Sequence, residues 1–433
     1  MPFISSSMKN FNPFFFLFLC YCIGACSTDR QAQEKPLKPK ESPVPLLIEK
    51  DELEDRVKGM LIGSAIGDAM GAPTEMWSRE EIKLEYGWVS QLEDMVREVS
   101  PEGTWKVNLP AGGTTDDTRW KKLVFEYLQK QDELTLDPLQ FSAHVLAEYE
   151  RYFEDFKKLR PDQTESLEYA NLRVLWLQEW YKVSLALQED DLMAYQQALG
   201  KFYGGEMVCA GLLYAPAIGL LYPGQPEMAY EQAFNLSLYD LGYARDISAL
   251  SAAMTAAAMT AENSPEKVLE ILRSVDPEGY FKSRLVGRSS YRILKTAQSI
   301  VEKVKSSLQI DNAPEGGNPA TSENMQLAFA LLDQHLQDMP FHAGEIHLQV
   351  LTAMLFCDFD FENTLIFLVN FGRDNDTTAA VAGAILGAFH GFEKLPETMK
   401  SQVIGVNKNQ LGIDLTGLAE KQVAHILALY GVK

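Results

Sequence analysis

Two short clusters of acidic and hydroxyl residues, more than 250 positions apart, contain the side chains best suited to chemistry. They read Thr115-Asp116-Asp117-Thr118 and Asp374-Asn375-Asp376-Thr377. Adjacent carboxylates repel one another, so their clustering does not improve folding. A hard divalent cation would remove the repulsion, and carboxylate and hydroxyl oxygens are the ligands that such cations prefer. The clusters are therefore predicted to be two halves of one metal-bearing active site that the fold brings together.

Each cluster precedes an apolar segment rich in small residues, which predicts that each lies at the N-terminus of a helix. Thr115 or Asp116 would cap a helix that begins near Thr118. Such a cap is common on its own, because the helix dipole favours negative charge in the first turn. The repetition of the arrangement at Asp374 favours a functional site, in which the carboxylates stay ionised for metal binding.

A third segment, from Gly63 to Glu75, contributes two further carboxylates. Asp68 stands between glycines in a helix that is expected to be buried, and a buried carboxylate needs a hydrogen-bonding partner or a metal. Either a structural bond to a nearby backbone N–H or a place at the metal would satisfy it. Glu75 follows the helix end at Pro73, on a loop able to reach a pocket.

From about Glu49 onward the chain is predicted to be helical almost throughout, because apolar residues recur at spacings of three and four. Helices are expected over residues 56–70, 123–129, 139–156, 167–187, 247–259, 267–274, 291–304, 323–337, 345–351 and 378–389. Alternating β-branched runs are scarce, so the fold class is predicted to be all-α. Residues 87–108 are predicted to form an irregular insertion near the first cluster, and residues 309–322 a loop.

Two series of glycines recur at every fourth residue. They are Gly59, Gly63, Gly67 and Gly71, and Gly383, Gly387 and Gly391. On a helix each series forms a strip without side chains along one face. Glycine costs about 1 kcal/mol relative to alanine inside a helix, so the repetition needs a cause. The prediction is a tight central group of helices whose backbones touch, with the acidic clusters at the helix N-termini and residues 244–261 as a possible third member.

The composition argues against nucleic acids as partners and against a disulfide framework. The 433 residues carry a formal net charge of -21, which repels nucleic-acid phosphates. No nucleic acid is therefore expected as a partner. After removal of the N-terminal segment, Cys26, Cys209 and Cys357 remain, too few for a disulfide framework.

The N-terminal segment predicts export and attachment to a bacterial membrane. Residues 1–25 are predicted to be a lipoprotein signal peptide, because the apolar run Phe14–Ala25 is too short to span a bilayer and small residues precede Cys26. Cys26 would be acylated, residues 26–48 would form a disordered tether, and residues 49–433 the folded domain. The location would be periplasmic or cell-surface, with the membrane contacted only through the lipid. An ordinary cleaved signal peptide is the alternative.

Together, three motifs resemble those of the ADP-ribosylglycohydrolase family, which includes the dinitrogenase-reductase-activating and ADP-ribosylarginine hydrolases. The motifs are Gly67-Asp68-Ala69-x-Gly71 with Glu75, then Thr115-Asp116-Asp117-Thr118, then Asp374-x-Asp376-Thr377. The resemblance implies a compact orthogonal multi-helix fold with two Mg²⁺ ions in a central metal cleft. The metal ligands that it implies are Thr115, Asp116, Asp117, Asp374, Asp376 and Thr377.

The implied reaction is hydrolysis of the bond between C1″ of ADP-ribose and an acceptor atom, in an ADP-ribosylated protein or a small ADP-ribosyl conjugate. The cations would orient the ribose hydroxyls and a water molecule. The candidates for catalytic roles are Glu75, Asp374 and Asp117, and either Glu75 or Asp374 would accept the proton of the water.

One departure from the family pattern keeps two alternatives open. The family commonly carries a Met-Arg pair shortly before an Ala-Pro-x-Gly segment, whereas here Leu212 and Leu213 precede the related segment Tyr214–Gly219. The first alternative is a hydrolase of another N- or O-glycoside or a nucleoside. The second is a non-catalytic binding or structural protein on the same fold.

The lipid anchor gives a testable prediction. Substitution Cys26→Ala removes the acylated thiol, so the protein should pass from the membrane fraction to the soluble fraction. Fractionation and immunoblotting measure this change, with Cys357→Ala as the control. Unchanged membrane association of Cys26→Ala would contradict lipidation.

Overall fold

A computed structural model describes residues 45–307 and 322–432 of the protein. This part contains helices and no named strand, only two isolated bridges, which pair Met95 with Leu109 and Val208 with His342. The α-helices of the first half are α1 (Lys50–Gly71), α2 (Arg79–Glu85), α3 (Asp116–Leu128), α4 (Pro138–Lys157), α5 (Thr164–Gln188), α6 (Leu192–Leu199), α7 (Ala215–Gly219) and α8 (Pro226–Leu236). Those of the second half are α9 (Ala244–Ala258), α10 (Pro265–Ser274), α11 (Ser289–Ser307), α12 (Ser322–Leu332), α13 (Ala343–Phe356), α14 (Phe361–Phe371), α15 (Asn375–His390), α16 (Glu397–Val406) and α17 (Leu415–Leu429). The predicted all-α class is confirmed.

Every helix that the apolar spacing predicted is present, and most extend further at one or both ends. The prediction missed seven of the described α-helices, which are α2, α6, α7, α8, α14, α16 and α17. The predicted signal peptide, residues 26–44 of the tether and nearly all of the loop over 309–322 lie outside the described residues. Within the last part of the predicted tether, the side chain of Ile48 is already buried against the core.

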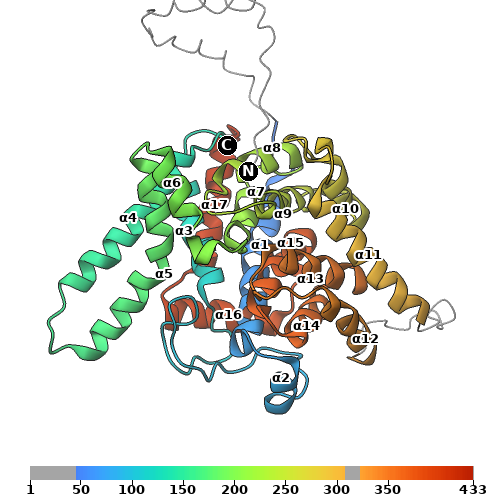
Figure 1. The fold of residues 1–433 in the computed structure, drawn as a ribbon, viewed down its shortest axis with the longest axis horizontal. Helices are drawn as coiled ribbons and strands as arrows, with labels where there is room; N and C mark the ends of the chain where they lie inside the picture. Colours follow the sequence, from blue (N-terminus) through green and yellow to red (C-terminus); the bar gives the residue numbers. More distant parts are fainter. Residues whose placement is uncertain (1–44, 308–321, 433) are drawn as a thin grey trace, which may run out of the picture. The chain divides into compact units, whose positions relative to one another are not determined.

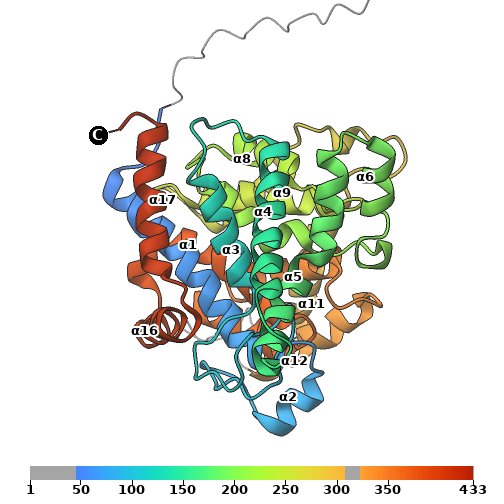
Figure 2. The ribbon, with the colours of Figure 1, turned by 90° about the vertical axis from the view of Figure 1, so that its left-hand side faces the viewer.

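Helices α1 and α15 cross in close antiparallel contact at the centre of the domain (Figure 1). Figure 2 shows α1 from another side, next to α17. A Cβ atom on Gly59 would stand 2.2 Å from the carbonyl oxygen of Gly387, and one on Gly63 would stand 2.5 Å from that of Gly383. Further along, a Cβ on Gly71 would meet the backbone of Asp376 at 2.4 Å. The glycine strips therefore face each other as predicted, and they bring the C-terminus of α1 onto the second acidic cluster.

The alanine-rich helix α9 packs on α15 and α7, so it is the predicted third member of the central group. A Cβ on Gly219 of α7 would meet the carbonyl oxygen of Ala252 at 2.3 Å, which shows a second backbone-close crossing. Buried Asp246 at the start of α9 accepts hydrogen bonds from Arg288, with Nη2 at 2.7 Å and Nε at 3.1 Å. This fully buried ion pair joins α9 to the start of α11.

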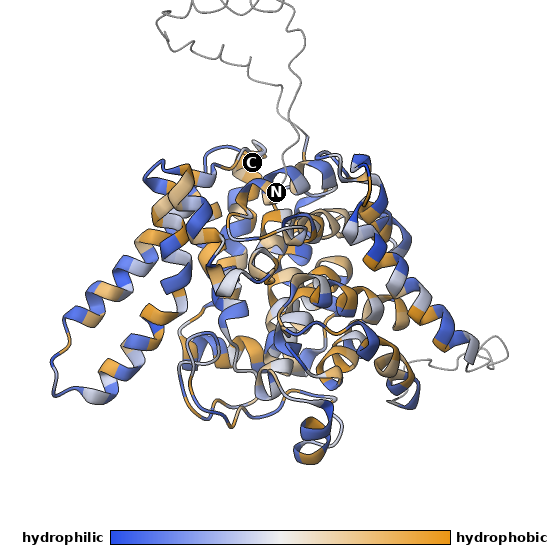
Figure 3. Ribbon diagram, in the orientation of Figure 1, coloured by the Kyte–Doolittle hydropathy of each residue, from blue (hydrophilic) through white to orange (hydrophobic). Residues whose placement is uncertain are grey.

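Helices α4 and α5 pack against each other as a long hairpin beside the central group (Figure 1). Hydrophobic residues are concentrated towards the centre of the domain, whereas the outer end of this hairpin is mostly hydrophilic (Figure 3). Among the described helices, none has both the length and the apolar character needed to cross a membrane. Cys209 and Cys357, the two cysteines within the described ranges, are buried and free.

The glycine contact gives a testable prediction. Substitution Gly387→Ala should lower the unfolding free energy by about 1–3 kcal/mol, because the new methyl group would stand 2.0 Å from the carbonyl oxygen of Gly59 and force the helices apart. The control is Gly405→Ala in α16, where a Cβ meets nothing within 4 Å, so helix propensity should stabilise the protein slightly. Thermal unfolding measures both changes. A Gly387→Ala variant as stable as the parent would contradict the close contact.

Candidate functional site

The carboxylate of Asp68, at the C-terminal end of α1, holds the first acidic cluster in place. Its Oδ1 accepts from the backbone N–H and the hydroxyl of Thr115, at 2.9 and 3.0 Å. Its Oδ2 accepts from the N–H and the hydroxyl of Thr118, at 2.9 and 2.6 Å. Asp68 therefore has the structural role that was one of its two predicted roles, and it fixes the N-terminus of α3.

The first cluster begins α3, with Thr115 as the N-cap residue and the helix starting at Asp116, two residues earlier than Thr118. Buried Asp117 accepts from Lys121 Nζ at 2.9 Å and from the Thr377 hydroxyl at 2.9 Å. The Thr115 hydroxyl also lies 3.2 Å from Asp376 Oδ2. The two clusters, distant in sequence, thus contact each other directly.

The second cluster is aligned with the loop of Glu75 by a short backbone pairing. The N–H of Met76 donates to the carbonyl oxygen of Arg373 at 2.7 Å, and the N–H of Arg373 donates to that of Trp77 at 2.9 Å. Met76 and Arg373 both adopt positive φ, 66° and 67°, a strained conformation for residues with a side chain. The surroundings enforce it: the Arg373 guanidinium binds both oxygens of Glu345, at 2.8 and 2.9 Å. Glu75 and Asp374 are therefore held in neighbouring positions.

The predicted irregular segment 87–108 is confirmed, and it closes one side of the site. Buried Arg119 of α3 fastens it, because the guanidinium donates to the carbonyl oxygens of residues 101–103 at 2.7–2.9 Å and stacks 4.0 Å from the Trp105 ring. Arg97 of the same segment binds Glu75 Oε2 at 2.6 Å. This attachment brings Ser100 and Glu102 to the site.

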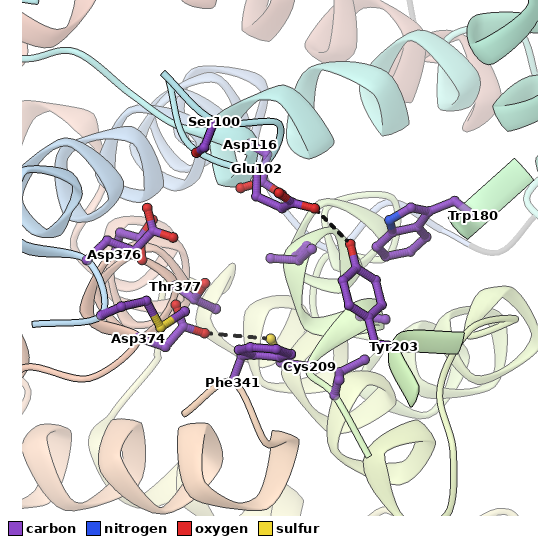
Figure 4. Close-up of a pocket in the computed structure, with 15 residues that line it drawn as sticks. Ser100, Glu102, Asp116, Trp180, Tyr203, Cys209, Phe341, Asp374, Asp376 and Thr377 are labelled. Carbon is purple, nitrogen blue, oxygen red and sulfur yellow. Dashed lines mark hydrogen bonds between the residues drawn. The ribbon is translucent and has the colours of Figure 1, made fainter. Parts of the chain in front are cut away.

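These elements surround a cavity of about 340 Å³. Its lining comprises Glu75, Met76, Ser100, Glu102, Asp116, Trp180, Tyr203, Val208, Cys209, Ala210, Leu213, Phe341, Asp374, Asp376 and Thr377. The carboxylates gather on one side, and the rings of Trp180 and Tyr203 stand opposite (Figure 4). The Tyr203 hydroxyl donates to Glu102 Oε1 at 3.3 Å, which links the two sides.

Three aspartates of the cavity bind protons more tightly than ordinary aspartates. Burial, followed by the charges of Glu75 and Asp117, raises the pKa of Asp374 to about 8. Burial also raises the pKa of Asp116, against the opposing effect of Arg119, and raises the pKa of Asp376, reinforced by Glu75 and Asp374. The helix dipole therefore does not keep the pKa values of these three aspartates low in the absence of a cation, because desolvation and mutual repulsion outweigh it.

The donor set nevertheless fits a hard cation. Oδ1 of Asp376 is buried without a hydrogen-bonding partner, which is costly unless a further group binds it. All the candidate donors are carboxylate or hydroxyl oxygens, as Mg²⁺ prefers. Within the described ranges, however, no three acidic, histidine or cysteine side chains already converge as a metal-holding group. Thr115 and Asp117 instead engage Asp68 and Lys121.

The structure brings together the residues that the sequence singled out. Glu75, Asp116, Asp374, Asp376 and Thr377 line the cavity, while Thr115 and Asp117 lie directly behind it. Sequence reasoning missed its other lining residues of chemical interest, which are Ser100, Glu102, Trp180, Tyr203, Cys209 and Phe341. They carry no motif, and their segments reach the cavity only through tertiary packing.

Comparison with known proteins agrees with this fold. A solved structure titled "ADP-ribosylglycohydrolase-related protein complex" matches 88% of this chain and 99% of its own, with a TM-score of 0.50 and 20% identity. In sequence, the Escherichia coli (strain K12) protein YegU is 22% identical over 370 residues, covering 84% of this chain and 97% of YegU. ADP-ribosylhydrolase ARH3 of Gallus gallus is 24% identical over 379 residues, covering 82% of this chain and 90% of ARH3.

The family comparison assigns the chain to a class of glycosyl hydrolases. Residues 49–430 match the family model described as ADP-ribosylglycohydrolase, so the chain belongs to the ADP-ribosylglycohydrolase family. Its membership confirms the resemblance drawn from the three motifs and identifies the protein as an enzyme. The matched range also begins at the residue where the folded domain was predicted to start.

The crowded carboxylates give a testable prediction. In EDTA, Asp376→Asn should raise the unfolding free energy by about 1–3 kcal/mol, because it removes a buried carboxylate that on folding must either take up a proton or carry a charge that no cation offsets. Asp246→Asn is the matched control, since its buried partner Arg288 would lose its counter-ion at a cost of about 3–5 kcal/mol. The midpoint temperature of thermal unfolding should rise for Asp376→Asn and fall for Asp246→Asn. Destabilisation of both to the same extent would contradict carboxylate repulsion at the site.

Proposed function

We propose that this protein hydrolyses the C1″ glycosidic bond of ADP-ribose in conjugates with a protein side chain or a small molecule, and that it requires Mg²⁺. The observation that carries the proposal is the convergence of Glu75, Asp116, Asp374 and Asp376 on one cavity in a member of this family. The name of the related ARH3 proteins, ADP-ribosylhydrolase, supports ADP-ribose as the sugar.

The metal would be held by the oxygens that line the cavity. Asp116, Asp374, Asp376 and Thr377 are exposed to it, and Asp376 Oδ1 has no other partner. Thr115 and Asp117 would support these ligands from behind, or join them after release from Asp68 and Lys121. When bound, Mg²⁺ supplies a Lewis acid that orients ribose hydroxyls and water and offsets negative charge.

Glu75 is best placed to accept the proton of the attacking water. The aspartates of the two clusters are assigned to the metal, and a carboxylate bound to a cation is a weak base. Glu75 lies outside that set, lines the cavity, and is oriented by Arg97 at 2.6 Å. Its negative charge also stabilises the oxocarbenium-like state that forms when the bond at C1″ breaks.

The proposal extends to the location of the protein. We propose that it is exported and attached to a bacterial membrane through acylated Cys26, with the catalytic domain in the periplasm or on the cell surface. The lipobox-like residues before Cys26 support this location. The acceptor would then be an exported or extracellular conjugate.

Release of ADP-ribose from arginine- and serine-linked conjugates tests the proposal. The parent should release it with Mg²⁺ and not with EDTA. Glu75→Gln should lower kcat by about 10²–10⁴-fold while Mg²⁺ binding, measured by calorimetry, persists, because it removes the proton acceptor and leaves the ligands intact. Glu80→Gln, on the exposed face of α2, is the matched control and should retain full activity. Full activity of Glu75→Gln would show that Glu75 is not the proton acceptor for the attacking water.

A further inference from the structure

Asp117 differs from the other aspartates of the two clusters, because it does not line the cavity. The three that do line it are Asp116, Asp374 and Asp376 (Figure 4). The Asp117 side chain is buried, and groups of the chain itself occupy both of its oxygens. Oδ1 accepts from Lys121 Nζ at 2.9 Å, and Oδ2 accepts from the Thr377 hydroxyl at 2.9 Å. No oxygen of Asp117 is therefore left without a partner.

Lys121 lies one turn further along α3 and is buried completely. Its side chain is 0% exposed, and in the described part of the chain its ammonium binds no acceptor other than Asp117. Lysine is almost never fully buried unless it is paired, because its charge is costly to remove from water. If Asp117 turned towards a bound cation, the ammonium would lose its counter-ion in a place that water does not reach. Asp117 is therefore fixed as the counter-ion of Lys121.

A cation that shared the carboxylate with Lys121 would also be disfavoured. The ammonium already offsets the single negative charge of Asp117. A metal ion on Oδ2 would repel the ammonium across the same carboxylate, and it would displace the Thr377 hydroxyl from that oxygen. Both effects oppose metal binding at Asp117.

The aspartates that face the cavity have the opposite character. Within the described ranges, the pair of Lys121 and Asp117 is the only ion pair that involves an aspartate of the two clusters. Asp376 in addition keeps Oδ1 buried without a hydrogen-bonding partner. A cation is therefore needed on the cavity side of the clusters, whereas Asp117 already has one from the chain.

The ion pair also orients Thr377, which lines the cavity. The hydroxyl proton of Thr377 is directed at Asp117 Oδ2. A hydroxyl that donates in this way keeps the lone pairs of its oxygen for another partner. Groups that lie behind a metal ligand commonly fix its orientation by such hydrogen bonds. Lys121 thus acts on the cavity through Asp117 and Thr377.

We infer that Lys121 is a positioning residue that supplies a built-in cation to the site. Its ammonium takes the place of a metal ion at Asp117, which supports Thr377 from behind and does not bind Mg²⁺. The inference rests on the Mg²⁺ requirement of the proposed function, and it selects one of the two roles that Asp117 could have there. The ligands of Mg²⁺ are then Asp116, Asp374, Asp376 and Thr377.

Calorimetric titration of the full-length protein with Mg²⁺ counts the bound cations. Asp117→Asn/Lys121→Met removes the ion pair as a unit, so it should bind as many equivalents as the parent, with an affinity within about tenfold. Lys121→Met should bind one equivalent more than the parent, because the Asp117 carboxylate has lost its cation. Asp376→Asn is the control for loss of a metal ligand and should bind one equivalent fewer. The inference is overturned if the double variant also loses an equivalent, or if folded Lys121→Met gains none.

Thermal unfolding distinguishes a cation of the site from an ordinary buried ion pair. Lys121→Met and Arg288→Met each remove the basic partner of a buried pair, and in EDTA each should lower the midpoint temperature by about 4–6 °C. Saturating Mg²⁺ should raise the midpoint of Lys121→Met by about 3 °C more than that of the parent, because the vacated carboxylate binds a further cation. Arg288 does not line the cavity, so Arg288→Met should gain no more than the parent. Equal gains for the two variants would overturn the inference.

Release of ADP-ribose, measured on the same preparations, separates this inference from the proposed function. If the parent releases ADP-ribose and the double variant lacks one equivalent of Mg²⁺, the inference is overturned and the proposed function stands. If the parent releases no ADP-ribose and the double variant keeps the parental number of equivalents, the proposed substrate is refuted and the inference stands.

Discussion

The contact between the backbones of α1 and α15 is the constraint on which the site depends. Side chains would hold two helices at the usual separation of 8–10 Å, whereas facing glycines let the chains touch. At that separation the end of α1 reaches the start of α15, so that Gly71 packs on the backbone of Asp376. Asp68, one turn earlier in α1, then reaches the first turn of α3. The crossing thus places both acidic clusters against a single helix end.

Such a group of buried carboxylates is by itself unfavourable for the fold. Burial and repulsion raise the pKa values of Asp374, Asp376 and Asp116, and Asp376 keeps an oxygen without a partner. The protein holds the groups in place with contacts that lie outside the cavity: Lys121 on Asp117, and Arg373 on Glu345. Positive φ at Arg373 adds strain that only a rigid surrounding can maintain. Natural proteins accept such local costs where function requires them.

The sequence predicted the acidic side of the cavity better than the aromatic and aliphatic side, for physical reasons. Glycines at four-residue spacing indicate close packing of helix backbones, so the contact between α1 and α15 could be predicted from the pattern alone. Paired carboxylates before an apolar segment indicate a binding site, so Asp374 could be predicted to line one. Glu102 stands in an irregular segment, and Tyr203 in a turn with positive φ, where neither period nor motif exists. Their positions follow from the attachment of the segment by Arg119 and from packing between distant helices. Raised pKa values were equally out of reach, because they depend on burial that no local pattern reports.

The acidic side of the cavity and its aromatic and aliphatic side come from different parts of the fold. The aspartates of the acidic side lie at the crossing of α1 and α15 and on α3. The other lining residues come chiefly from α5, from the turn at Tyr203, from residues 208–213 and from the loop before α13. Because these segments pack around the contact between α1 and α15, substitutions in them leave the contact between the two helix backbones in place. The acidic side of the cavity thus rests on the rigid helix crossing, whereas the apolar wall and the Asp240 carboxylate that accepts from the Gly211 N–H belong to segments packed around that crossing.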